Sequence, residues 1–478
     1  MNYEPVIGLE VHLHLKTKTK AFCGCSTEFG QEPNSQVCPV CLGFPGSLPV
    51  LNKTALDYAL KVALALNCQI QEYTKFDRKN YFYPDLPKNY QISQYDLPLS
   101  RNGFLEIALD GGKLKRIGIR RVHLEEDAGK LIHQEDSSLI DFNRAGIPLL
   151  EIVSEPDLNS PGEAHEYLTT LKSIIEYLYV SDCDMEKGSL RCDANISLRK
   201  TGQQDLGTKA ELKNMNSFKA VKEALTFEIE RQAELLNQKK TVVQETRSWD
   251  VKNLETVSMR TKEEAQDYRY FPEPDLPPFI LSPDKITEIK KTIPELPRDK
   301  MLRFVKDYGL SDYDAKILVA TLKDANFSEE CIRLYSKNDK KPIVNWLIGP
   351  ILYEANSRNC NLSDLGVAVK DLIGLVDFVE RQEISYLAAK SVLSEMINIK
   401  DSPAHIIQKK NLAQISDIKS LELQVGEVLK ENPKSIQDYK AGKGNAIMFL
   451  VGQIMKKTGG KANPKVVQEI LKRRLSNA

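Results

Sequence analysis

The chain has 478 residues, and at about 150 residues per domain this length predicts about three domains. Hydrophobic residues make up 41 % and charged residues 28 %, which is ordinary for a folded protein and excludes a wholly disordered chain. No apolar run approaches the ~18 residues of a membrane span, and the first ten residues lack the features of a secretion signal. The sequence therefore predicts no membrane partner.

The 66 basic and 66 acidic residues balance, but they are unevenly distributed. Residues 441–478 hold eight basic residues and one acidic residue, so this tail carries +7 and the rest of the chain −7. A basic tail suggests an anionic partner, although solvated helix charge is an equally good explanation. The nine cysteines are an odd number in a chain too large to need disulfides, which indicates a reducing, cytoplasmic compartment.

Alternation of apolar and polar residues dominates the first ~290 residues and predicts strands. The clearest segments are 7–15 and 191–199, and the pattern is weaker over 117–127 and 208–215. Helical periodicity appears over 53–66, 161–179 and 217–238. Because the strands follow one another with few helices between them, we expect an α+β domain with a mostly antiparallel sheet and flanking helices.

Seven prolines between Pro272 and Pro297 predict an extended segment and a domain boundary. Amphipathic helices are expected beyond it, over 300–308, 312–323, 341–356 and 385–399. Ser402-Pro403 suggests a second break. In the last part Ser435 is expected to cap a helix, a second helix covers 445–457, and Pro464 begins the last one. The predicted domains are a catalytic cradle (1–293), an all-helical domain (294–402) and a small basic helical tail (403–478).

The most specific spacing is Cys23-x-Cys25, twelve residues, then Cys38-x-x-Cys41. Four thiolates in two close pairs suit a tetrahedral zinc ion, and a site with four protein ligands is structural because no position stays open for water. The sequence therefore predicts a zinc-binding loop over 23–41. Four free cysteines in a loop are the alternative.

Acidic residues and histidines share the polar faces of the predicted strands. Glu10 and His12 are spaced i, i+2, as are His123, Glu125 and Asp127. Glu151 lies within an apolar run, where an unpaired carboxylate would be costly. Carboxylates with an imidazole suit Mg²⁺, which prefers oxygen ligands. Surface charges and salt bridges are the simpler explanation.

Cationic and aromatic residues alternate over 75–85, including Lys79 and Tyr81, and can address phosphates and bases. A tyrosine-rich loop anchored on a core is the alternative. Lys209, Glu211 and Lys213 share one strand face. The sequence has no P-loop, no G-x-G-x-x-G and no G-x-S-x-G motif, so any use of ATP would occur on an open sheet.

Several long blocks of the sequence resemble the GatB family, which belongs to the aspartyl/glutamyl-tRNA(Asn/Gln) amidotransferases. In chain order they are VIGLEVH (6–12), KFDRKNYFYPDLPKNYQIS (75–93), HLEEDAGK (123–130), DFNRAGIPLLEIVSEPD (141–157), GSLRCDANIS (188–197), KAELKNMNSF (209–218) and DYRYFPEPD (267–275). GKGNAIMFLVGQIMK (442–456) resembles the family's helical tail. The blocks cover the chain from end to end.

The resemblance implies that the protein uses ATP to phosphorylate the side-chain carboxylate of misacylated Glu-tRNA(Gln) or Asp-tRNA(Asn). Ammonia from a partner amidase (glutaminase) subunit would then give the amide, and a small third subunit would complete a heterotrimer. It implies a Mg²⁺ cluster of Glu10, His12, Glu125 and Glu151. It further implies phosphate or ATP contacts by Lys79, Arg191 and Lys213, and catalytic contributions from Lys79, Tyr81, Asp193, Glu211 and Lys213. Because some members lack the four cysteines, zinc would be structural only.

Two other functions remain open from the sequence. A zinc-stabilised RNA-binding module would explain the cysteines and the basic tail but not a buried acid such as Glu151. A free-standing ATP-dependent ligase would consume ATP with no partner and no tRNA.

Overall fold

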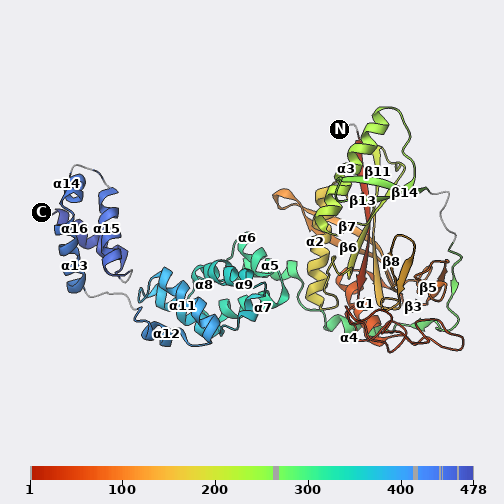
Figure 1. Ribbon diagram of the computed structural model, residues 1–478, viewed down its shortest axis with the longest axis horizontal. Helices are drawn as coiled ribbons and strands as arrows, with labels where there is room; N and C mark the ends of the chain where they lie inside the picture. Colours follow the sequence, from red (N-terminus) through yellow and green to blue (C-terminus); the bar gives the residue numbers. More distant parts are fainter. Residues whose placement is uncertain are drawn as a thin grey trace. The chain divides into compact units, whose positions relative to one another are not determined.

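A computed structural model describes residues 3–261, 268–412, 418–440, 443, 445–459 and 462–476. The chain divides into two compact units, Met1–Leu296 and Pro297–Ala478 (Figure 1). The first unit holds all the described strands and the second is helical, so the expected α+β class is confirmed. The three-part division at residues 293 and 402 stays a prediction. Of the described helices, none combines the length and apolarity needed to span a membrane.

A nine-stranded sheet forms the centre of the first unit, in the order β14-β13-β12-β11-β1-β10-β7-β6-β2. Among the described strands of this sheet, β12 and β13 are the one parallel pair, so the prediction of a mostly antiparallel sheet is confirmed. The strands are β1 (Tyr3–His14), β2 (Gln69–Ile70), β6 (Ser100–Ala108), β7 (Leu114–Glu126), β10 (Pro148–Ser154), β11 (Leu190–Lys200), β12 (Ala210–Lys213), β13 (Glu245–Asp250) and β14 (Glu255–Thr261).

One face of this sheet is apolar and carries the core. Leu9, Val11 and Leu13 of β1 are fully buried, as the alternation predicted. The three helices that contact this sheet are α1 (Lys53–Ala65), α2 (Pro161–Leu178) and α3 (Phe218–Asn237). Asn52, Ser160 and Ser217 begin them, since each side chain accepts a backbone N–H of the first turn. The other face of the sheet is therefore free to hold polar side chains.

Smaller strands form three further sheets in the first unit, β15-β4-β5, β16-β3 and β8-β9. Their bounds are β3 (Tyr73–Thr74), β4 (Asp77–Asn80), β5 (Tyr90–Ser93), β8 (Lys130–His133), β9 (Ser138–Asp141), β15 (Phe271–Pro272) and β16 (Phe279–Ile280). A 3-10 turn, η1 (Asp110–Gly112), joins β6 to β7. The proline-rich segment is not wholly extended as expected, because Ser282 caps a helix, α4 (Pro283–Lys291), that has Pro283 in its first turn.

The second unit consists of helices. They are α5 (Pro297–Tyr308), α6 (Asp312–Leu318), α7 (Leu322–Leu334), α8 (Lys341–Trp346), η3 (Leu347–Ile351), α9 (Leu352–Ser357), η4 (Leu362–Leu365), α10 (Val369–Glu380), α11 (Tyr386–Ile399), α12 (Pro403–Lys409), α13 (Ile418–Glu431), α14 (Pro433–Lys440), α15 (Asn445–Lys457) and α16 (Pro464–Ser476). Parts of α13, α15 and α16 share a hydrophobic core of their own, which includes Leu421, Leu450 and Leu471.

Two expectations for this unit are wrong in detail. The helix expected over 312–323 ends at Leu318, because Thr321 is extended and its side chain accepts the N–H of Asp324 to begin α7. Ser435 is not a cap, since α14 begins at Pro433 and Ser435 lies inside it. The other predicted helices are present, and the long one over 341–356 contains a π-helical turn at Pro350.

Candidate functional site

The polar face of the nine-stranded sheet brings together residues that are far apart in the sequence. In the strand register, His12 of β1 pairs with Glu151 of β10 on one side and with Arg191 of β11 on the other. Glu151 in turn pairs with His123 of β7. A second row, one step of two residues away, joins Glu10, Asp193 and Lys213. This face therefore carries a contiguous set of charged and imidazole side chains.

A cluster suited to a metal ion lies around the first row. His12, Glu125 and Glu151 each offer one ligand atom, and these atoms all lie within 4.8 Å of one another. His12 Nε2 lies 3.4 Å from Glu151 Oε2. Ser93 of β5 donates a 2.9 Å hydrogen bond to Glu125 Oε2, which fixes that carboxylate. Two carboxylates beside one imidazole match the donors expected for Mg²⁺ with remaining water ligands.

Glu10 lies outside that group of three. Its carboxylate accepts a 2.9 Å hydrogen bond from Asn195 Nδ2 in the neighbouring strand. Burial, and then the charges of Glu151, Glu211 and Asp193, raise the pKa of Glu10 above its ordinary value. A nearby cation would relieve this crowding of negative charge, so its place as a metal ligand stays a prediction.

His123 is the member of this cluster that the sequence did not select. Its Nε2 lies 3.6 Å from both Glu125 Oε2 and Glu151 Oε2. Burial would raise the pKa of Glu125 and of Glu151, but the imidazoles of His123 and His12 outweigh it and hold both pKa values below the ordinary range. Arg121 Nη2, 3.5 Å from Glu151 Oε1, adds a further positive charge. Both carboxylates are therefore held in their charged, metal-binding form.

Lys79 lies on β4, which pairs with β5, the strand that carries Ser93. Its Nζ is 4.7 Å from the centre of the Tyr268 ring and 6.0 Å from that of Tyr81. The charge of Lys79 is one of the influences that lower the pKa of Glu125. The cation–π contact keeps the ammonium available to an incoming anion, because in the described residues no carboxylate lies within 4 Å of it.

Lys213 lies between two carboxylates at the other end of the face. Its Nζ is 2.5 Å from Asp193 Oδ2 and 3.0 Å from Glu211 Oε1. Burial alone would lower the pKa of Lys213, but the two carboxylates outweigh it and raise it. Thr246 of β13 donates a 2.8 Å hydrogen bond to Glu211 Oε2. The structure thus brings together three residues that the sequence named, as one charged triad.

Arg191 is held by a buried carboxylate at the end of β7. Its Nη2 lies 3.0 Å from Asp127 Oδ2, which also accepts from His14 Nε2 at 2.6 Å. Burial opposes ionisation of Asp127, but Arg191, His14 and Arg144 hold its pKa well below the ordinary range. Asp127 thus fixes Arg191 beside His12 in the strand register. The expected contact of Arg191 with ATP stays a prediction.

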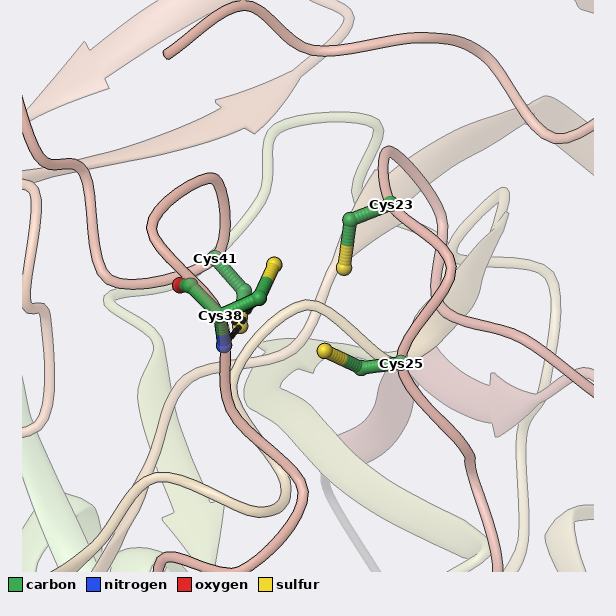
Figure 2. Close-up of side chains that lie close together, drawn as sticks. All are labelled: Cys23, Cys25, Cys38 and Cys41. Carbon is green, nitrogen blue, oxygen red and sulfur yellow. Dashed lines mark hydrogen bonds between the residues drawn. The ribbon is translucent and has the colours of Figure 1, made fainter.

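The four cysteines of the 23–41 loop lie together, with their sulfur atoms facing one another (Figure 2). One Sγ atom from each fits within the same 4.8 Å limit, and all four are free thiols. Cys38 and Cys41 are 3.9 Å apart at Sγ, and the Cys38 N–H points at Cys41 Sγ from 3.2 Å. Four sulfurs converging from two turns match the donor set and geometry of a closed zinc site.

Comparison with known proteins identifies the family. A family model described as the GatB/GatE catalytic domain matches residues 5–287, and one described as the GatB domain matches residues 326–475. The chain belongs to the GatB/GatE family. A protein of Carboxydothermus hydrogenoformans named as the GatB-type subunit of an aspartyl/glutamyl-tRNA(Asn/Gln) amidotransferase is 54 % identical to it over 99 % of both chains. A protein of Clostridium tetani with the same name is 50 % identical over 98 % of both.

The predicted resemblance is confirmed by these matches, and the GatB/GatE catalytic domain covers all the residues of the polar face. Three kinds of residue were missed by sequence reasoning. Ser93, Asn195 and Tyr268 act as partners of named residues, and only the sheet order brings them there. The i, i+2 spacing of His123 to Glu125 was visible in the sequence and would have found His123.

Proposed function

We propose that this chain is the GatB-type subunit of a tRNA-dependent, glutamine-hydrolysing amidotransferase and carries its ATP-dependent step. The reaction is phosphorylation of the side-chain carboxylate of Glu-tRNA(Gln), Asp-tRNA(Asn) or both, followed by attack of ammonia to give the amide. The names of relatives at 50–54 % identity support the assignment. The observation that carries it is the largely buried His12, Glu125 and Glu151 cluster on an open polar sheet face beside Lys79.

In this proposal His12, Glu125 and Glu151 hold Mg²⁺, with Glu10 one register row away. The ion supplies positive charge that neutralises phosphate oxygens, which phosphoryl transfer needs more than covalent chemistry. Lys79 approaches the same region as a second positive charge.

Arg191 and Lys213 contribute the nucleotide contacts at either end of the face. Asp193 and Glu211 hold the Lys213 ammonium in place, and Tyr81 lies beside Lys79. These carboxylates can also accept a proton from an attacking ammonia, so we assign the triad to the amidation step.

The remaining partners follow from the chemistry. The sequence has no local Ser–Lys or Cys–His nucleophile motif, so we assign ammonia production to a separate amidase (glutaminase) subunit, with a small third subunit, in a cytoplasmic heterotrimer. The basic segment 403–478 is assigned to tRNA, and the division into cradle, helical domain and tail is kept at 293 and 402.

Co-purification of the untagged chain from its native cell tests the function. We expect an amidase-type subunit and tRNA to accompany it, and the assembled complex to convert Glu-tRNA or Asp-tRNA to the amide with ATP and glutamine. ATP hydrolysis by the isolated chain without tRNA would favour a free-standing ligase. Bound RNA without any ATP consumption would favour an RNA-binding module.

The cysteine cluster leads to a prediction about zinc. Elemental analysis of the pure chain should find about one zinc per chain, held by Cys23, Cys25, Cys38 and Cys41. Cys38→Ser removes one ligand and should lower the melting temperature and zinc content, while chain that stays folded keeps amidation activity. Cys360→Ser, at a cysteine outside the cluster, is the matched control. Metal-free wild-type chain of unchanged stability would contradict this site.

A further inference from the structure

Lys20 is a fully buried lysine beside the cysteine cluster. Its Nζ lies 3.7 Å from Cys41 Sγ and donates a 3.2 Å hydrogen bond to the carbonyl oxygen of Phe142. Within the described residues no carboxylate oxygen lies within 4 Å of this Nζ. Glu126, which lines the same cavity of about 210 Å³, is instead paired with Lys88 at 2.5 and 2.6 Å. Lys20 is therefore a buried cation whose available anion is sulfur.

A buried cation without a counter-charge is strongly destabilising, so the charge of Lys20 must be balanced by the cluster. Four neutral thiols cannot balance it. Four thiolates around a divalent ion carry a net charge of −2, and a neighbouring ammonium offsets part of that excess. The burial of Lys20 is thus explained when the cluster is filled by metal.

We propose that Lys20 is an outer-shell positioning residue of the four-cysteine metal site and links that site to the polar sheet face. The proposal rests on the zinc site proposed above and assigns its charge partner. Groups that contact metal ligands commonly tune affinity, and their removal costs about 10- to 100-fold in metal binding.

The link to the polar face runs through the backbone. The N–H of Ala21, next to Lys20, donates a 2.8 Å hydrogen bond to the carbonyl of Gly146. The N–H of Gly146 donates to the carbonyl of Asp127 at 2.9 Å, and Asp127 holds Arg191. Gly146 has φ +86°, and a Cβ there would lie 3.3 Å from Lys20 Cδ, so glycine lets the two segments meet. A metal that fixes Lys20 therefore also fixes the position of Asp127.

Zinc competition against a metallochromic chelator, with the full-length chain, tests this inference. Lys20→Met keeps the length of the side chain and removes its charge, and we expect it to weaken zinc binding about 10- to 100-fold. Lys18→Met, at an exposed lysine two residues away, should bind zinc as the wild type does. Equal affinities of Lys20→Met and wild type would overturn the role of Lys20 and leave the zinc site standing. A wild-type chain that binds no zinc would overturn both.

A measurement on the wild-type chain covers the case in which Lys20→Met does not fold. Hydrogen exchange at the amides of Ala21 and Gly146 is compared with and without zinc. We expect removal of zinc to accelerate exchange at both amides, and to leave the amides of α2, on the apolar face, unchanged. Unchanged protection of Ala21 and Gly146 would overturn the proposed link.

Discussion

Glu125→Gln is expected to reduce tRNA-dependent ATP hydrolysis and amide formation by more than about a hundredfold, because even outer-shell partners of a metal ligand contribute 10- to 100-fold. The carboxylate of Glu125 is buried, lies 3.6 Å from His123 Nε2 and accepts a hydrogen bond from Ser93. Glutamine keeps the size and an oxygen that can accept from Ser93. It removes only the charge that would hold the ion.

The assembled complex is the sample for this measurement, and Glu135→Gln is the control because Glu135 is an exposed carboxylate in the turn between β8 and β9. The glutaminase activity of the complex should fall much less than amidation, because that chemistry is assigned to another subunit. Titration with Mg²⁺ should show a weakened requirement that higher concentrations restore in part. A normal rate of ATP-dependent amidation in Glu125→Gln would remove Glu125 from the proposed ligand set.

The strands could be predicted from the sequence where one face is buried and the other polar. In β1 the alternation places Leu9, Val11 and Leu13 in the core, and Glu10 and His12 on the opposite face. A single sequence cannot give the order of the strands. β1 lies between β10 and β11, which begin about 140 and 190 residues later, and this order alone decides that His12 meets Glu151 and Arg191.

The candidate site was predictable to the same extent. Glu151 was identified by its place in an apolar run, because a buried carboxylate needs a partner. Its partners, His12 and His123, come from two other strands and could not be read from local spacing. Tyr268 approaches Lys79 from a segment 189 residues further on, which no periodicity encodes. The cysteines, in contrast, are close in sequence, so their spacing alone predicted that they converge.

Helix ends were less predictable than helix positions. Periodicity continued from Asp312 past the end of α6, since the next helix has the same period. The break depends on Thr321, whose side chain competes for a backbone N–H and starts a new helix. At Ser435 the opposite happened, because Pro433 begins α14 two residues earlier than the predicted cap.

Removal of the C-terminal module is expected to weaken binding of charged tRNA about tenfold or more at physiological salt and to flatten its salt dependence. The structure places the cut after Leu412. α12 buries Ile406 and Ile407 and contacts α10 and α11, so a cut before α12 would expose a core, whereas α13, α15 and α16 bury a core of their own. The remaining chain should therefore stay folded.

Charge and shape of this module are separable by substitution. Four exposed cations lie on α15 and α16 and form no ion pair among the described residues: Lys456, Lys465, Lys472 and Arg474. Changing all four to glutamine should reproduce much of the loss, and the slope of log affinity against log salt should fall by about 3, since each phosphate contact contributes about 0.7–0.9. The matched control changes four exposed lysines of the preceding helices, Lys306, Lys316, Lys370 and Lys409.

Kinetics on the assembled complex distinguish binding from chemistry. The apparent KM for charged tRNA should rise in the truncated and four-fold variants, while kcat at saturating tRNA stays near that of the wild type. This follows because Glu125, Glu151 and Lys79 all lie in the first unit, which the cut does not touch. If the truncated complex binds tRNA with unchanged affinity and an unchanged salt slope, the basic charge of the tail is solvated helix charge. A large fall in kcat at saturating tRNA would instead mean that the tail helps to position the aminoacyl end on the polar sheet face.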